Sequence, residues 1–220
     1  MIAIPYKIFR SDRKTIVLVI DSSAKLIVRA PYSALETEIT GLIKKKKRWI
    51  LEKQQQITEA NKKLNPAVIK NGGTLLYLGN SYTIAMEKVS KIRISGENII
   101  MPKGIKKEKV IAWLKKEAGK LLRERAAHYA DIMSLQYSTI KITSAKTRWG
   151  SCSGKNNLNF TWRLIMCPPA AIDYVIVHEL SHILIKNHSP EFWARVKLFY
   201  PDFKKQKKWL KANRKIMDIF

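Results

Sequence analysis

The chain has 220 residues, 46% of them hydrophobic, which is enough for one large or two small domains, and it contains no apolar run of 18 residues that could span a membrane. Its formal net charge of +25 indicates attraction to polyanions such as nucleic acid, an anionic membrane or an acidic protein, although lysines that merely solvate helix faces would give the same total. Two cysteines, Cys152 and Cys167, exclude a disulfide framework, and because the N-terminus lacks the apolar region of a signal peptide we expect a reducing, cytoplasmic setting.

The first part of the chain predicts a β-rich region with one helix. Short segments rich in branched aliphatic residues, separated by turn residues such as Asp21-Ser22-Ser23-Ala24 and Gly79-Asn80, predict strands and hairpins. Residues 34–63 have apolar residues near helical spacing, so we expect a single helix that exposes the basic run 44–48. The predicted strands cover 14–20, 25–30, 74–78, 81–86 and about 91–101.

The second part predicts helices around a few strands. Residues 106–133 predict a long amphipathic helix, and strands are expected at 139–143 and 158–164. The predicted buried stripe of the long helix is Val110, Leu114, Ala118, Leu121 and Ile132. Three more helices are expected at about 169–187, 190–199 and 202–216. The predicted fold class is therefore α+β, with a β-rich region at 1–104 and a second domain at 105–220.

The run His178-Glu179-Leu180-Ser181-His182 is the most informative motif. Two histidines four residues apart lie on one face of a helix, about 6 Å apart along its axis, so both imidazoles can reach a single zinc ion (Zn²⁺). Glu179 is rotated by about 100° from His178, which makes it a poor ligand but a suitable general base. Zinc lowers the pKa of a bound water to about 7, and the carboxylate can then take its proton. Pro168 and Pro169 are well placed to open this helix.

A third ligand requires the chain to turn back toward the ion. In a continuous helix His188 would lie about 240° from His182 and point away. Asn187 tolerates the left-handed conformation that ends helices, and Ser189-Pro190 has the features of a new helix start. We therefore predict His188 in a break between two helices as the third ligand. Glu191 is the alternative third ligand, and Cys152 is a weaker one.

Ordered blocks of the second half resemble the YgjP-like metallopeptidase family, which is similar to the SprT-like and Wss1-like zinc proteases. The resemblance is strong over roughly 100–220 and loose before that. It implies a zincin-type α+β core with strands over the metal-bearing helix, zinc held by His178, His182 and His188, and Glu179 as the catalytic acid/base. The blocks that carry it are Arg148-Trp149-Gly150-Ser151-Cys152-Ser153, Leu158, Trp162-Arg163-Leu164, Pro168, Asp173-Tyr174-Val175, the motif at 178–182, Asn187-His188-Ser189 and Phe192-Trp193.

Two residues near the motif have alternative roles. Arg148 could stabilise the oxyanion that forms when water attacks a carbonyl, or it could serve with Trp149 in packing and ion pairing. The segment 146–153 is a candidate edge strand that pairs with an extended peptide substrate. Tyr174 lies one turn before His178, where it could hydrogen-bond near the ligand or act as a core aromatic.

Taken together, these residues predict a zinc-dependent hydrolase that cleaves bonds in a peptide or protein substrate, with an amidase as a near alternative. The rival interpretation is a DNA-associated protein with a structural metal centre, or a protease recruited to DNA, in which the lysines bind nucleic acid. A structural zinc site needs a fourth protein ligand, and the sequence offers no convincing one, which favours catalysis. Oligomeric state and cleavage preference have no signal in the sequence.

Overall fold

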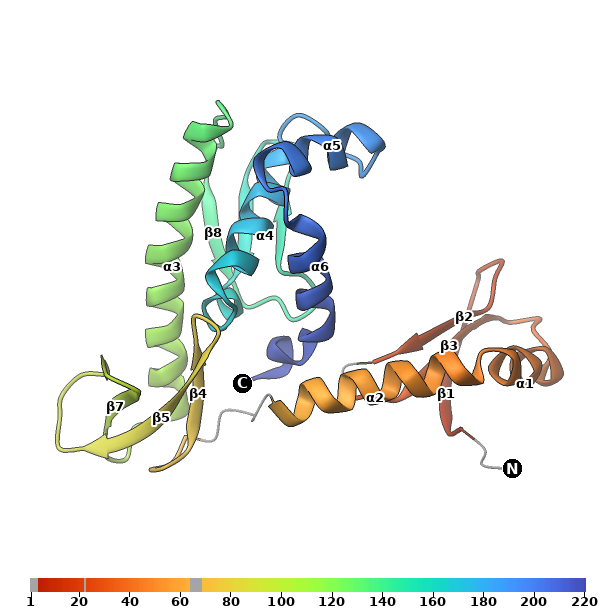
Figure 1. The fold of residues 1–220 in the computed structure, drawn as a ribbon, viewed down its shortest axis with the longest axis horizontal. Coiled ribbons are helices and arrows are strands. Elements are labelled where there is room, and N and C mark those ends of the chain that lie inside the picture. Colours follow the sequence, from red (N-terminus) through yellow and green to blue (C-terminus); the bar gives the residue numbers. More distant parts are fainter. Residues whose placement is uncertain (1–3, 22, 64–68) are drawn as a thin grey trace. The chain divides into compact units, whose positions relative to one another are not determined.

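The computed structural model describes residues 4–21, 23–63 and 69–220. The backbone divides into two compact units, residues 1–65 with 212–215 and residues 66–211 with 216–220. The described residues form six α-helices and three small sheets, so the predicted α+β class is confirmed (Figure 1). Among these residues, no helix combines the length and the apolar character that crossing a bilayer requires. The predicted domain boundary after Gly104 stays a prediction.

The first unit contains a three-stranded sheet in the order β1-β3-β2. Its strands are β1 (Tyr6–Ser11), β2 (Val17–Ile20) and β3 (Leu26–Pro31). The predicted hairpin is present as the antiparallel pair β2–β3, and β1 adds to β3 in parallel. Alternate residues of β3 point to one face and are fully buried. The core of this unit contains Leu26, Val28, Ala30, Ala34, Ile39, Ile43 and Ile50.

The predicted single helix at 34–63 is wrong, because two helices form, α1 (Glu36–Lys45) and α2 (Lys47–Lys63). Between them Lys46 leaves helical geometry, with φ −101° and ψ 12°. Five successive basic side chains span this point, and like charges one turn apart, such as Lys44 and Arg48, destabilise a continuous helix. Buried isoleucines on both sides of the break then anchor each helix separately.

The second unit begins with a four-stranded sheet in the order β4-β5-β7-β6. Its strands are β4 (Thr74–Tyr77), β5 (Asn80–Glu87), β6 (Arg93–Ser95) and β7 (Asn98–Pro102). The β4–β5 turn has positive φ at both Leu78 and Gly79, the geometry of a tight hairpin. Leu78 donates its backbone N–H to the Ile165 carbonyl over 2.7 Å. A Cβ on Gly79 would lie 2.9 Å from the Pro168 Cα, so only glycine allows this turn to contact Pro168.

A second sheet, in the order β8-β10-β9, lies later in the same unit. Its strands are β8 (Ile140–Thr143), β9 (Gly150–Cys152) and β10 (Leu158–Thr161). β10 pairs in parallel with β8 and antiparallel with β9, which leaves β9 at an edge. The strand predicted at 158–164 ends early, because the buried residues Trp162–Met166 form a 3-10 helix, η1. Within η1, the Arg163 guanidinium donates to the carbonyls of Ser144, Ile219 and Phe220 and so ties the C-terminus to this sheet.

The long helix α3 (Lys107–Ile132) forms as predicted, with two errors in its buried stripe. Leu121 is half-buried and Ile132 is exposed. The buried residues recur every four positions through Ala118, Leu122, Ala126 and Ala130, and Leu121 and Ile132 are out of phase with that row.

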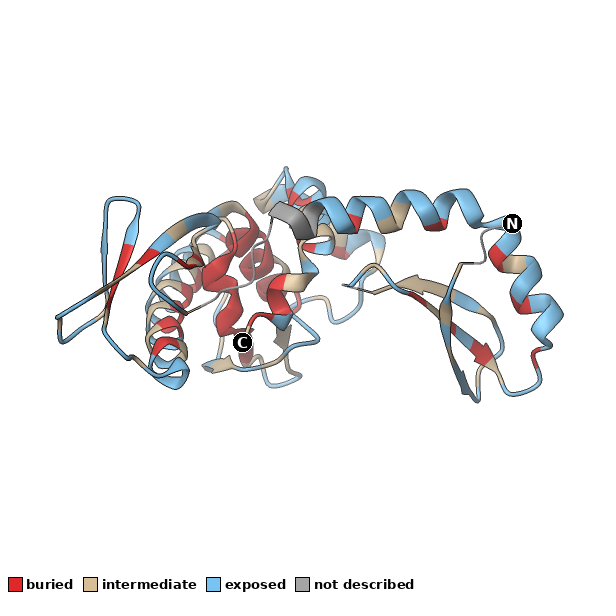
Figure 2. Ribbon diagram, turned by 90° about the horizontal axis from the view of Figure 1, so that it is seen from below, coloured by how far each residue is buried: buried red, intermediate tan, exposed pale blue. Residues whose placement is uncertain are grey.

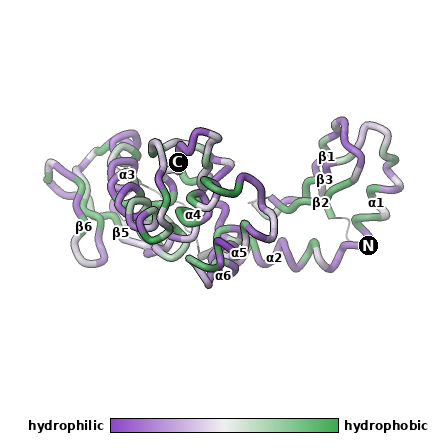
Figure 3. The backbone as a smooth tube through the Cα atoms, turned by 90° about the horizontal axis from the view of Figure 1, so that it is seen from above, coloured by the Kyte–Doolittle hydropathy of each residue, from purple (hydrophilic) through white to green (hydrophobic). Residues whose placement is uncertain are grey.

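Three more helices complete the unit: α4 (Pro169–Ser181), α5 (Pro190–Phe199) and α6 (Phe203–Ala212). The helix predicted at 202–216 is shorter, because Arg214–Asp218 forms a second 3-10 helix, η2. The helix α4 is hydrophobic along most of its length and almost wholly buried, which is the pattern of a central core helix (Figures 2 and 3). Pro168 takes its N-cap position and Pro169 follows at the first position, as predicted.

Candidate metal centre

The helix α4, which carries the His-Glu-Leu-Ser-His motif, is fixed to its neighbours by polar contacts as well as by burial. Asp173 of α4 accepts two hydrogen bonds from the Arg125 guanidinium of α3, the one from Nε to Oδ1 being 2.7 Å long. The Tyr200 hydroxyl donates to the Ala170 carbonyl in the first turn of α4 over 2.8 Å. A helix held in this way presents its last turn at a defined place.

The three predicted ligands converge at the end of α4. His178, His182 and His188 each offer a ring nitrogen, and these atoms all lie within 4.8 Å of one another. The Nε2 atoms of His178 and His188 are 3.1 Å apart. His182 is the C-cap residue and still has helical geometry, with φ −68° and ψ −11°, so the predicted one-face relation to His178 holds.

The predicted end of this helix near Asn187 is wrong, because α4 ends at Ser181. The Ser181 hydroxyl donates to the Val177 carbonyl, and the following amides bond three residues back, as Ile183 does to Leu180. This tighter turn reverses the direction of the chain. His188, in the break before α5, therefore lies close to His178 and His182. Here the structure agrees with the prediction that His188 lies between two helices.

The ring nitrogens are arranged as metal ligands require. His182 Nδ1 lies 2.9 Å from the Ile185 carbonyl, so Nδ1 carries the proton that it donates and Nε2 is left with a free lone pair. Burial, and then the neighbouring His182, His188 and Lys207, lower the pKa of His178 to about 3. Burial also lowers the pKa of His188. Three imidazole nitrogens that lie within 4.8 Å of one another form a donor set that fits a divalent ion such as zinc.

Two aromatic residues at the start of α5 form the wall behind the histidines. Phe192 is fully buried and stacks on His182, with ring centroids 4.4 Å apart, while its edge contacts His178 at 4.9 Å. Trp193 stacks on His188 at 5.6 Å. Sequence reasoning placed no role on this pair, although an aromatic dipeptide one turn after a ligand histidine is a usable signal for such a wall.

Glu179 lies on the side of α4 that contacts β9. Its side chain is buried, and burial raises the pKa of Glu179 to about 8. A hydrogen bond from the Cys152 backbone N–H and the charge of Arg148 act in the opposite direction and lower this pKa. The carboxylate is therefore held beside the histidine cluster by the neighbouring strand.

Residues 14–213 match the family model of the YgjP-like metallopeptidase domain. This chain belongs to the YgjP-like family. The match includes most of the first unit as well as the second, so the family relation extends further toward the N-terminus than the motif blocks alone indicate.

The YgjP-like chain is also similar to two solved structures. One is the crystal structure of the metallopeptidase zymogen of Pyrococcus abyssi abylysin, at 21% identity and a TM-score of 0.38, covering 41% of this chain and 92% of that one. The other is the metallopeptidase zymogen of Methanocaldococcus jannaschii jannalysin, at 21% identity and a TM-score of 0.36, covering 41% and 95%. A comparison with curated proteins finds no match.

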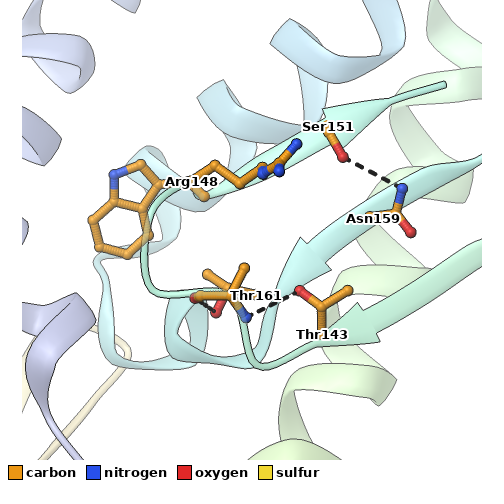
Figure 4. A pocket seen from close by; sticks show the side chains of 8 residues that line it. Thr143, Arg148, Ser151, Asn159 and Thr161 are labelled. Atoms are coloured by element: carbon orange, nitrogen blue, oxygen red, sulfur yellow. Dashed lines mark hydrogen bonds between the residues drawn. The ribbon is translucent and has the colours of Figure 1, made fainter. Parts of the chain in front are cut away.

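Arg148 of the YgjP-like chain is exposed and lines a cavity of about 280 Å³ beside β9 (Figure 4). Ser151 and Asn159, which share a hydrogen bond, line the same cavity. Successive residues of a strand point to opposite faces, so the Ser151 side chain points away from the face of β9 that contacts Glu179, although Gly150 itself also lines the cavity. The charge of Arg148 nevertheless reaches Glu179, and its role in catalysis stays a prediction.

The other ligand candidates do not join the cluster. Among the described residues, the group that could hold a metal at this site consists of the three histidines without Glu191 or Cys152. Glu191 is exposed, and a hydrogen bond from Ser189 lowers its pKa. Tyr174 is buried with its ring edge-on to His178 at 5.8 Å, and burial raises its pKa to about 12.

Proposed function

We propose that this metallopeptidase uses zinc, held by His178, His182 and His188, and that Glu179 is its general base. The observation that carries the proposal is the convergence of three imidazole nitrogens within 4.8 Å of one another, with the buried Glu179 adjacent to His178 in the motif. Three protein ligands leave one position open, which is the pattern of catalytic rather than structural zinc. A peptide or protein substrate follows from the family.

The chain's own residues move the proton. When bound, zinc supplies Lewis acidity that polarises a carbonyl and acidifies water. Glu179 accepts a proton at its carboxylate as the water oxygen attacks the carbonyl carbon, and it returns that proton to the amine nitrogen when the C–N bond breaks. Burial raises the pKa of Glu179, whereas a cation beside it lowers that pKa, and a value near neutrality suits both steps.

The strand β9 is the proposed docking site for the peptide. Within its sheet, β9 pairs with β10 along one edge, and its other edge carries no strand of the described residues. β9 is also the strand that contacts Glu179. An extended peptide can add to such an edge through backbone hydrogen bonds, which leaves its side chains free for selection. Arg148, next to β9, is proposed to stabilise the oxyanion.

Two variants test the roles of ligand and base. Glu179→Gln should keep the metal, measured by elemental analysis, and lower kcat about 10²–10⁴-fold, since the general base is lost. His178→Ala should lose the metal. Glu191→Gln and His128→Ala are matched controls, because both residues are exposed and lie outside the cluster. Wild-type turnover by Glu179→Gln would refute the proposed mechanism.

DNA binding, or recruitment of the peptidase to DNA, stays a prediction from the net charge of +25. Binding to duplex and single-stranded DNA across a salt series tests it, because contacts to phosphates weaken steeply as salt rises. Absence of binding at modest salt would leave solvation as the role of the lysines.

A further inference from the structure

A glycine of β9 faces the buried carboxylate. Gly150 pairs with Phe160 of β10, and a Cβ built on it would lie 2.7 Å from Cγ, 2.8 Å from Oε1 and 3.0 Å from Cδ of Glu179. Gly150 is not among the glycines with positive φ, so its backbone conformation does not require glycine. What requires glycine at this position is the volume that Glu179 occupies.

The same strand also supplies a hydrogen-bond donor to the carboxylate. Cys152 lies two residues after Gly150 on β9, and its backbone N–H donates a hydrogen bond to Glu179. β10 fixes both positions, because Gly150 pairs with Phe160 and Cys152 pairs with Leu158. Thr161 adds a hydrogen bond from its N–H to the Trp149 carbonyl, 3.0 Å long. The strand thus offers a vacant volume and a donor at fixed places.

We propose that Gly150 is a positioning residue, whose missing side chain lets the Glu179 carboxylate sit between β9 and the histidines while the Cys152 N–H sets its orientation. This inference rests on the proposed function of Glu179. A methyl group at position 150 would push the carboxylate away from its donor, and the buried side chain has little room to adjust.

Gly150→Ala is the first test. Because a displacement of about 1 Å can cost about 10²-fold in rate, kcat should fall by about that factor, with KM within about two-fold and the metal content unchanged. Gly154→Ala is the matched control, since nothing lies within 4 Å of a Cβ there and its φ is not positive. Wild-type kcat in Gly150→Ala would overturn the inference.

A double-mutant cycle tests the contact without using activity. Glu179→Ala removes the atoms that Gly150→Ala would strike, so the loss of Tm caused by Gly150→Ala should disappear in the Glu179→Ala background. If Gly150→Ala alone fails to fold, the double variant with Glu179→Ala should fold again. Additive Tm shifts would overturn the inference. If Glu179→Gln is active but the Tm effects of Gly150→Ala and Glu179→Ala are not additive, the proposed mechanism is refuted. The contact between Gly150 and Glu179 is then still established.

A separate observation concerns the charge of the substrate. Lys207 of α6 is exposed, and its Nζ lies 3.8 Å from the centroid of the Trp193 ring, the ring that stacks on His188. Lys186, two residues before His188, donates from Nζ to Asn156 Oδ1, in the turn between β9 and β10. The charge of Arg148 reaches Glu179. Cations from three different segments therefore contact or act on residues of the site or their neighbours.

We infer from this arrangement, and from the proposed peptidase function, that the site prefers peptides with an acidic side chain close to the scissile bond. Charged groups placed around a site favour ligands of the opposite sign and disfavour those of the same sign. Lys207, which lies over Trp193, is the cation of this set whose charge acts on both His178 and His188.

Binding to metal-loaded Glu179→Gln protein tests this preference independently of turnover. Fluorescent peptides that differ only by Glu or Gln at one position are compared by anisotropy. The Glu peptide should bind about five-fold more tightly, and Lys207→Gln should remove most of that difference. Lys205→Gln is the control, because it lies about 200° round α6 from Lys207. Equal affinities for both peptides, or equal losses in the two lysine variants, would overturn the inference.

Discussion

The helices α4 and α2 are both predicted by hydrophobic pattern, yet they are stabilised in different ways. Every residue of α4 from Ala171 to Val177 is buried, and Asp173 within this stretch is paired with Arg125. In α2 the first turns bury Ile50 but expose Trp49 and Leu51, and the ion pair Arg48–Glu52 lies at the surface. We therefore expect the candidate metal centre to depend on packing volume and buried ion pairing, and α2 to tolerate changes of surface charge.

The largest effect is expected where the wall of the metal centre is removed. Phe192→Ala should lower the free energy of unfolding by about 3–5 kcal/mol, because it opens a cavity under His178 and His182. Loss of this support should also weaken metal affinity by about 10–100-fold. Chemical denaturation and competition with a chelator measure the two effects. An unchanged metal affinity would show that the histidines are positioned without this ring.

A smaller effect is expected at the contact between the β4–β5 turn and Pro168. Gly79→Ala should cost about 2–4 kcal/mol, because it combines a positive φ of 82° with a clash against Pro168. Gly96→Ala, at a positive φ of 55° with nothing within 4 Å, should cost about 1–2 kcal/mol for the backbone alone. The difference in unfolding free energy isolates the contact, and equal costs would show that the turn does not support α4.

The smallest effects are expected for two substitutions that compare the partly buried ion pair of α4 with the exposed ion pair of α2. Asp173→Asn should cost about 2 kcal/mol, because the partly buried Arg125 loses its charged partner. Glu52→Gln removes the partner of Arg48 at the surface of α2 and should leave the stability unchanged within error. Urea denaturation of the two variants in parallel measures both, and a similar loss in each would contradict the distinction between the helices.

Local sequence signals predicted most of the elements and the histidine cluster. The two prolines mark the start of α4, the four-residue spacing places His178 and His182 together, and the Ser189-Pro190 pair marks the start of α5. These features succeed because their physical cause lies within a few residues. The breaks at Lys46 and Ser181 were missed, since they depend on charge repulsion and on a serine that bonds back to Val177.

Contacts between segments that are distant in the sequence could not be predicted from local sequence patterns. The parallel pairs β1–β3 and β8–β10 join strands separated by other elements, and no local pattern specifies which strands meet. The contact of Gly150 with Glu179 depends on the register of β9, in which a shift by one residue would turn Ser151 toward the carboxylate instead. The sequence block around Gly150 carries the family resemblance, but the reason for a glycine at this position lies in the assembled sheet.

The hydrogen bond from Leu78 to Ile165 has a practical consequence for shortened versions of the protein. The hairpin that provides it precedes all of the motif blocks, yet it satisfies a carbonyl in the segment leading into α4. A fragment that starts after Gly104 would leave this backbone acceptor unpaired and uncover the first turn of the motif helix. Minimal catalytic fragments should therefore begin before Thr74, even though the chemistry resides a hundred residues later.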